Sequence, residues 1–147
     1  MIVYRITTAQ WSKQLQASGN VARWNSRGNF VIYTAGSRSL ACLENLVHRS
    51  GELCSKQYKV MLIEIPDSII MEEIMLKSLD IDWKNLTNFS YSQSIGAKWL
   101  NAGKAAVLKV PSIIIAQESN YLINPQHADF KKIKLLREED FGFDARF

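Results

Sequence analysis

A carboxylate and two guanidinium groups occur at positions where the neighbouring residues are apolar. Glu44 follows Leu40 and Leu43 in a segment with helical spacing, and on a helical wheel it falls within the apolar arc. A carboxylate on a buried face is costly unless it is paired or its cost serves a function. Arg5 and Arg23 also stand among apolar residues, and a guanidinium binds phosphate or carboxylate through two parallel hydrogen bonds. These residues therefore indicate either a buried ion pair between Glu44 and an arginine or a site for an anionic ligand.

Three further side chains are of types that take part in catalysis or binding, although each also has an ordinary structural explanation. Tyr33 lies in the middle of a strand-like apolar segment, and the sequence leaves open whether its face is the inner one. Ser112 follows Pro111, a position where serine commonly caps a turn. His48 lies at the edge of the apolar arc that holds Glu44, which is typical of a histidine at the surface.

The elements that must position these residues are strands and helices in irregular alternation. Apolar and β-branched segments predict strands at 2–7, 30–35, 58–66, 105–110, 112–116, 120–123 and 131–136, the last at a sheet edge. Helical spacing and capping residues predict helices at 8–17, 37–49, 71–79 and 94–102. Within the helix at 37–49, the wheel places Val47 on the apolar side and Asn45 and Arg49 on the polar side. Because the order is not a regular βαβ repeat, we predict an α+β fold.

Composition is that of an ordinary globular protein. The 147 residues predict a single domain over 1–147, with 47% hydrophobic and 22% charged residues. Cys42 and Cys54 cannot form a disulfide framework, and no Cys/His cluster has zinc-ligand spacing, so we predict no metal. No signal peptide or bilayer-length apolar segment is evident, which predicts a cytoplasmic protein without a membrane partner.

Charge and motif content give little support to several common classes. The net charge of +4 is modest and its lysines and arginines are spread along the chain, which favours a solvated surface over direct nucleic-acid binding. The sequence contains neither a GxGxxG nor a GxxxxGK[ST] phosphate loop, and neither an HExxH nor a GxSxG motif. The enzyme classes that these motifs identify therefore receive no support.

An ordered set of short segments, spread over essentially the whole chain, resembles the RES domain. These segments are RWN at 23–25, VIYTA at 31–35, SLACLE at 39–44, VPS at 110–112, ESNYLINP at 118–125 and FDAR at 143–146. The family is named for an arginine, a glutamate and a serine, which correspond here to Arg23, Glu44 and Ser112. The sequence departs from the family at Ala145, where a proline is common, and the region 72–101 matches least.

The resemblance implies a fold similar to that of ADP-ribosyltransferases, with a mixed sheet core and flanking helices. It also implies a toxin of a type II toxin–antitoxin pair that attacks NAD+ and cleaves the nicotinamide–ribose bond. Such toxins deplete NAD+ by hydrolysis or phosphorolysis and arrest growth, or they transfer ADP-ribose to a protein. NAD+ would be a substrate, and no metal is implied. The expected partners are an Xre-type helix-turn-helix antitoxin that blocks the active site and a second copy of the chain in a homodimer.

The resemblance also implies roles for individual residues. Glu44 would stabilise the cationic sugar and orient an attacking water. Arg23 and Arg5 would bind the pyrophosphate. Tyr33 would stack on nicotinamide and fix it through its hydroxyl, and Ser112 would bind the nicotinamide-side ribose or hold Glu44. The predicted catalytic set is therefore Arg23, Tyr33, Glu44 and Ser112, and the predicted NAD+-binding set is Arg5, Arg23, Tyr33 and Ser112.

Two other functions remain open from the sequence. A basic domain of this size could cleave RNA, but its only histidines, His48 and His127, do not lie in basic surroundings. Alternatively, the chain could be a non-enzymatic binding module in which an arginine and Glu44 form a structural ion pair.

Overall fold

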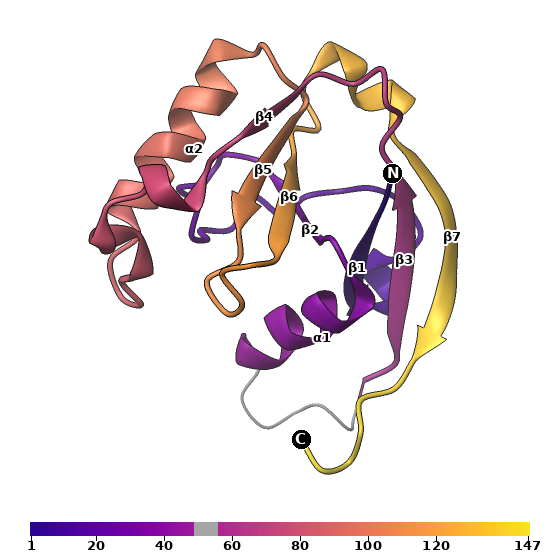
Figure 1. Cartoon of the computed structure of the whole chain (residues 1–147). Helices are drawn as coiled ribbons and strands as arrows, with labels where there is room; N and C mark the ends of the chain where they lie inside the picture. The colour runs from indigo at the N-terminus through magenta and orange to yellow at the C-terminus, as the bar shows by residue number, and fades with distance from the viewer. Residues whose placement is uncertain (49–55) are drawn as a thin grey trace.

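The computed structural model describes residues 1–48 and 56–147 (Figure 1). The strands are β1 (Ile2–Thr8), β2 (Ile32–Ala35), β3 (Tyr58–Glu64), β4 (Met71–Glu73), β5 (Val107–Pro111), β6 (Ser119–Ile123) and β7 (Lys134–Phe141). The α-helices are α1 (Arg38–Val47) and α2 (Ser90–Ala102), and the short 3-10 helices are η1 (Ala9–Trp11), η2 (Leu76–Ser78), η3 (Ile81–Lys84) and η4 (Ala128–Lys132).

The strands form one mixed sheet with the order β4-β5-β6-β2-β1-β3-β7. Neighbouring strands are antiparallel, except that β4 and β5 run parallel. β1 pairs with β3 along its whole length, whereas its register with β2 consists of the single pair Tyr4 and Ala35. The sheet therefore has two well-paired parts, β4-β5-β6-β2 and β1-β3-β7, that meet at a short seam.

Both α-helices pack on the same face of the sheet. Leu40 of α1 shares an apolar cluster with Ala35 of β2, and Trp99 of α2 shares another with Leu122 of β6, against which Tyr33 packs. Tyr33 and Ala35 are two positions apart on β2, so their side chains point to the same face. The sequence did not determine which face of this strand is the inner one. In the structure, the α-helices cover the face that carries Tyr33.

The described residues that cover the opposite face form no α-helix. Leu15, Ala17 and Phe130 pack there against a buried cluster that includes Ile32 and Met61. The segment that follows η1 is therefore tied to the sheet by its apolar side chains. None of the helices in the described residues combines the length and the apolar character that crossing a bilayer requires.

The structure confirms the predicted α+β class and several of the elements. α1 begins after Ser37, whose Oγ accepts a hydrogen bond from the Leu40 N–H over 3.1 Å, as expected of an N-cap. α2 ends at Gly103, which adopts a left-handed conformation with φ of 61°. β7 lies at an edge of the sheet as predicted, although it begins later, at Lys134. The helix predicted at 37–49 corresponds to α1, and its predicted end at residue 49 lies outside the described residues.

Three predicted elements are wrong, and long-range contacts explain each difference. The helix predicted at 8–17 is limited to η1, because the residues after it lie against the sheet. The helix predicted at 71–79 begins instead as β4, which pairs with β5. The strand predicted at 112–116 is a turn, in which the Ser112 hydroxyl accepts hydrogen bonds from the backbone N–H groups of Ile114 and Ile115.

The helical wheel also assigned two side chains of α1 to the wrong environment. Asn45, expected on the polar side, donates a 2.7 Å hydrogen bond to the backbone oxygen of Ile6 in β1. Val47, expected on the apolar side, is 62% exposed. The wheel describes the helix alone, whereas the position of β1 decides which side of α1 is covered.

Candidate active site

Glu44 is positioned by the attachment of α1 to the loop between β5 and β6. Ser37, the N-cap of α1, donates a 3.1 Å hydrogen bond to the carboxylate of Glu118 in this loop. Ser112, at the start of the same loop, donates a 2.9 Å hydrogen bond to Oε1 of Glu44, two turns further along the helix. The loop therefore holds α1 at two points, and the second of these is the candidate catalytic carboxylate.

The carboxylate of Glu44 is held by neutral groups. Oε1 accepts the bond from the Ser112 hydroxyl and a second, of 2.6 Å, from Nδ2 of Asn120 on β6. Both hydrogen bonds that the described residues donate to Glu44 thus end on the same oxygen. Within the described part of the chain, neither Arg5 nor Arg23 forms an ion pair with Glu44. The geometry therefore does not support the buried arginine–glutamate pair that the sequence left open.

Ser112 is completely buried, with 0% of its surface exposed. Its hydroxyl donates to Glu44 and accepts from two backbone N–H groups of the following turn, so its hydrogen-bonding capacity is used within the protein. Of the two roles implied by the resemblance, this environment supports the holding of Glu44 rather than direct contact with a ribose.

Arg23 is anchored on one side of its guanidinium. Its Nη1 donates to the backbone oxygens of Trp83 (2.6 Å) and Asn85 (3.0 Å), and the guanidinium carbon lies 4.7 Å from the ring centroid of Phe89. These three partners come from η3 and from the segment between it and α2, within the region that least resembles the family. The described residues place no hydrogen bond on Nε or Nη2, which leaves that side of the fork for a ligand.

α2 fixes the backbone on which Arg23 stands. Nε2 of Gln93 donates to the backbone oxygens of Ala22 (3.0 Å) and Asn25 (3.2 Å). One turn further along α2, Gly96 lies so close to this segment that a Cβ atom would come within 1.8 Å of the backbone oxygen of Trp24. The absence of a side chain at Gly96 therefore permits the close contact between the helix and the arginine-bearing segment.

Tyr33 uses its hydroxyl within the protein. The hydroxyl donates a 2.6 Å hydrogen bond to Oδ1 of Asn25 and accepts one of 3.2 Å from the Trp24 N–H. The structure therefore shows a hydroxyl that supports the Arg23 segment, while the resemblance gave it a role in fixing nicotinamide.

The pKa values of Arg23 and Tyr33 reflect a shared environment. Burial lowers the pKa of Arg23, and the charges of Glu44 and Tyr33 act in the opposite direction. Burial raises the pKa of Tyr33, against which the Trp24 N–H and the charge of Arg23 act. Arg23 is therefore close enough to both Glu44 and Tyr33 to interact with them electrostatically.

Arg5 lies apart from this group. Its neighbours in β1, Tyr4 and Ile6, point toward α1, so Arg5 points to the opposite face, where its Nη1 donates a 2.8 Å hydrogen bond to the Gln16 backbone oxygen. Burial lowers the pKa of Arg5. Arg5 therefore does not stand beside the carboxylate, and its predicted role in binding NAD+ depends on the pocket that it lines.

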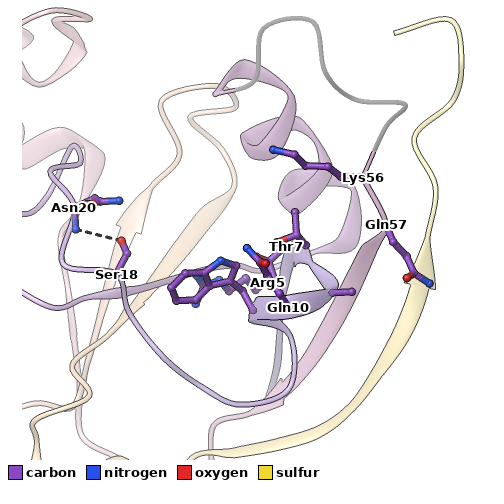
Figure 2. A pocket seen from close by; sticks show the side chains of 10 residues that line it. Arg5, Thr7, Gln10, Ser18, Asn20, Lys56 and Gln57 are labelled. Atoms are coloured by element: carbon purple, nitrogen blue, oxygen red, sulfur yellow. Dashed lines mark hydrogen bonds between the residues drawn. The ribbon is translucent and has the colours of Figure 1, made fainter.

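The pocket at Arg5 has a volume of about 600 Å³. Figure 2 shows its polar lining, which includes Thr7, Ser18 and Asn20 around Arg5. Asn20 connects it to the other group, because the Asn20 backbone oxygen accepts a 2.9 Å hydrogen bond from Nδ2 of Asn25, the partner of the Tyr33 hydroxyl. Arg23, Tyr33, Glu44 and Ser112 do not line this pocket.

The structure identifies two polar side chains, Asn25 and Asn120, that received no role from the sequence. Both occur within segments that resemble the family, RWN and ESNYLINP, and this was the only signal available in the sequence. Their contacts with Tyr33 and Glu44 join residues that are distant along the chain. In the part of the chain that the structure describes, no three His, Cys, Asp or Glu side chains gather closely enough to hold a metal ion.

Comparisons with known proteins agree with the resemblance. The model of the RES domain matches residues 2–144. A Sphingobium protein named Prs ADP-ribosylating toxin is 39% identical over 127 residues, which are 84% of this chain and 78% of that protein. A Photorhabdus laumondii protein named Toxin Res is 31% identical over 151 residues, covering 99% of this chain and 96% of its own.

A solved structure has the same fold. The crystal structure of the M. tuberculosis MbcT–MbcA toxin–antitoxin complex contains a chain that superposes with a TM-score of 0.78 at 18% identity. The superposition covers 96% of this chain and 84% of that one. It confirms the mixed sheet with flanking helices. Because the family model spans nearly the whole sequence, this chain belongs to the RES-domain family.

Proposed function

We propose that this protein is the toxin of a type II toxin–antitoxin pair and that it attacks NAD+ by cleaving the nicotinamide–ribose bond. Hydrolysis or phosphorolysis of this bond depletes NAD+ and arrests growth. The proposal rests on the membership of the RES-domain family and on the arrangement of Glu44, Arg23 and Tyr33.

The observation with most weight is that Glu44 is held by neutral donors. Ser112 and Asn120 fix the carboxylate without neutralising it, whereas an ion pair with an arginine would cancel its negative potential. A fixed negative group in a partly buried site stabilises positive charge that develops in a transition state. Glu44 therefore suits a reaction that passes through a cationic sugar.

Hydrolysis of NAD+ is such a reaction. The bond between the nicotinamide nitrogen and ribose C1′ breaks, and its electron pair remains on the nitrogen, so nicotinamide departs as a neutral molecule. Positive charge is then shared between the ring oxygen and C1′. Glu44 stabilises this charge and accepts a proton as the oxygen of water bonds to C1′. The products are nicotinamide, ADP-ribose and one proton; with inorganic phosphate as the nucleophile, ADP-ribose 1″-phosphate forms instead.

Arg23 and Arg5 are the basic residues that bind the dinucleotide. The Nε and Nη2 side of Arg23 is suited to bind phosphate oxygens, since Nη1 and the ring of Phe89 fix its direction. The ring of Tyr33 stacks on nicotinamide. In this proposal Arg5 binds the distal part of the dinucleotide in the pocket that it lines, whose residue Asn20 accepts a hydrogen bond from Asn25.

Transfer of ADP-ribose to a protein is the second candidate function. It is favoured by the similarity to the Sphingobium protein, whose name describes an ADP-ribosylating toxin. The first step is the same, and a nucleophilic side chain of the target takes the place of water. The mass spectrum of proteins exposed to the toxin and NAD+ distinguishes the two, because transfer adds one ADP-ribose to a target and hydrolysis adds none.

The proposed partners are an Xre-type helix-turn-helix antitoxin, which covers the active site, and a second copy of the toxin. The similarity to a toxin solved in complex with its antitoxin supports the first of these. Co-expression with the product of the adjacent gene should restore growth and suppress nicotinamide release, and light scattering of the free toxin should give the mass of a dimer.

The decisive experiment is the release of nicotinamide from NAD+ by Glu44→Gln. We expect a loss of about 100-fold or more, because the substitution removes the charge and retains the shape. Glu72→Gln on β4 is the matched control and should retain the wild-type rate. Circular dichroism and thermal unfolding establish that both variants are folded.

A parallel incubation with RNA tests the competing enzyme class. Degradation of RNA with NAD+ left intact would refute the proposal. The structure gives RNA cleavage little support, because His127 caps η4: its Nδ1 accepts from the Asp129 N–H, and its Nε2 lies 3.0 Å from the Gly103 backbone oxygen. If Glu44→Gln unfolds, Glu44 has a structural role. This outcome would support the interpretation of the chain as a binding module.

A further inference from the structure

Asn120 lies at a rigid position in the sheet. It is paired on one side with Ala35 of β2 and on the other with Val110 of β5, so its backbone is fixed between two neighbouring strands. The side chain points to the face that carries α1, where its Nδ2 meets Glu44. An amide at such a position has a well-defined direction.

The two ends of the Asn120 amide have different environments. Nδ2 donates a 2.6 Å hydrogen bond to Oε1 of Glu44. Oδ1 is buried and has no hydrogen-bond partner among the described residues. The orientation is set by Glu44, since a carboxylate only accepts hydrogen bonds and must face the NH₂ end of the amide. A buried acceptor without a partner is costly, so its retention beside a candidate catalytic group calls for a donor that arrives from outside.

We propose that Asn120 both positions Glu44 and accepts a hydrogen bond from a hydroxyl of the nicotinamide ribose. This inference rests on the proposed function. Together with Ser112, the Nδ2 group occupies Oε1 of Glu44, which directs Oε2 toward the substrate. Oδ1 of Asn120 then takes the ribose hydroxyl, so the substrate supplies the donor that the free protein lacks. The site would consequently require a ribose and discriminate against a deoxyribose at this position.

Asn120→Asp gives the sharpest test, because it retains the shape and replaces a donor by a second carboxylate next to Glu44. At neutral pH the two like charges disrupt the arrangement, and we expect nicotinamide release to fall about 100-fold. At lower pH the pair shares one proton, which restores a donor to Oε1, and the rate should recover toward that of the wild type. A residue with a merely structural role would not move the pH profile in this way.

Asn120→Ala tests the contact with the sugar. Asn120→Ala should have a higher KM for NAD+ than the wild type. The wild type should in turn have a higher KM for NAD+ analogues that lack one hydroxyl of the nicotinamide ribose than for NAD+ itself. For the analogue that lacks the bound hydroxyl, the wild type and Asn120→Ala should have similar KM values, because the interaction is already missing. This measurement remains decisive if Asn120→Asp does not fold.

Asn45→Ala is the matched control. Asn45 has an equivalent buried Oδ1 without a partner among the described residues, but its Nδ2 bonds to Ile6 of β1 rather than to Glu44. Its substitution should lower stability and leave the pH profile unchanged. Wild-type pH profiles and KM values in both Asn120 variants would overturn this inference and leave the proposed function intact. A wild-type protein that releases no nicotinamide would overturn both.

Discussion

At the scale of single residues, the structure accounts for the hydroxyl of Tyr33 and leaves the ring for the proposed function. The hydroxyl bonds to Asn25 and to the Trp24 backbone, and burial raises its pKa, so it remains protonated at neutral pH and does not serve as a base. In the proposed function, the ring is the part of Tyr33 that contacts nicotinamide. The predicted role of Tyr33 thus divides into support of the Arg23 segment and stacking on the substrate.

Substitutions of Tyr33 separate these tasks. Tyr33→Phe should lower the free energy of unfolding by about 1–3 kcal/mol, because Asn25 and the Trp24 N–H lose their partner. It should retain nicotinamide release within about tenfold, whereas Tyr33→Ala should lose far more, since the aromatic contact disappears. Thermal unfolding and initial rates measure both effects. A Tyr33→Phe variant that is stable but as inactive as Tyr33→Ala would show that the hydroxyl contacts the substrate.

At the scale of elements, α2 determines where Arg23 stands. Gln93 bonds to the backbone on both sides of the arginine, and Gly96 permits close contact with Trp24. This helix belongs to the part of the sequence that least resembles the family, so a segment without recognisable motifs positions a residue of the candidate site. The loop from Ser112 to Glu118 has the corresponding task for α1 and Glu44.

Gly96→Ala tests the packing of α2 against the Arg23 segment. In an isolated helix this change would stabilise by about 1 kcal/mol. Here the new Cβ would lie 1.8 Å from the Trp24 oxygen, so backbone atoms must move. We expect a net loss of about 1–3 kcal/mol in stability and a higher KM for NAD+, because Arg23 is displaced.

Gly142→Ala is the matched control for this substitution. A Cβ at Gly142 would meet nothing within 4 Å, and the stability and KM of this variant should stay close to those of the wild type. Chemical denaturation and steady-state kinetics provide the two readouts. A Gly96→Ala protein that is more stable than the wild type and equally active would contradict the close contact.

At the scale of the whole molecule, α1 spans the seam between the two parts of the sheet. Its Asn45 bonds to β1 in one part, while its Glu44 bonds to β6 in the other. Arg38, at the start of α1, also forms an ion pair with Glu139 of the edge strand β7. α1, which carries Glu44 of the candidate site, thus contacts both parts of the sheet.

The ion pairs of β7 predict how stability depends on pH. Hydrogen bonds from Arg38 and then Arg137 lower the pKa of Glu139 from 4.5 to about 2. Because its pKa is lower in the folded state, charged Glu139 stabilises the fold above about pH 4.5, and this contribution is lost as the pH falls toward about 2. Glu139→Gln should therefore lower Tm at pH 7 by a small amount that vanishes in acid and shrinks in high salt, since these side chains are exposed.

Glu64→Gln on β3 serves as the control for this prediction, because the described residues form no ion pair with Glu64. Its Tm should follow that of the wild type at every pH. Calorimetric scans from pH 7 to pH 2 measure the difference between the variants. A difference for Glu139→Gln that is constant over this range would mean that the carboxylate acts through packing rather than charge.

The sequence by itself determined the elements whose pattern is local. The apolar run of β3 and the capped helix α1 follow from neighbouring residues alone, and so does the α+β class. The resemblance also selected Arg23 and Glu44, which the structure places close enough to interact electrostatically. Their types and their apolar surroundings marked them because buried charges are rare unless they are paired or functional.

Only the tertiary structure decided which partners these residues have. Asn120 bonds to Glu44 across 76 positions of the chain, and Arg23 bonds to Trp83 across 60. No local pattern encodes such contacts. The strand at residues 71–73 is a similar case, because it forms through long-range pairing with β5. Hydrogen bonds and buried surface gained between distant segments outweigh the small differences in free energy between local conformations, so the chain adopts the conformation that the whole fold favours.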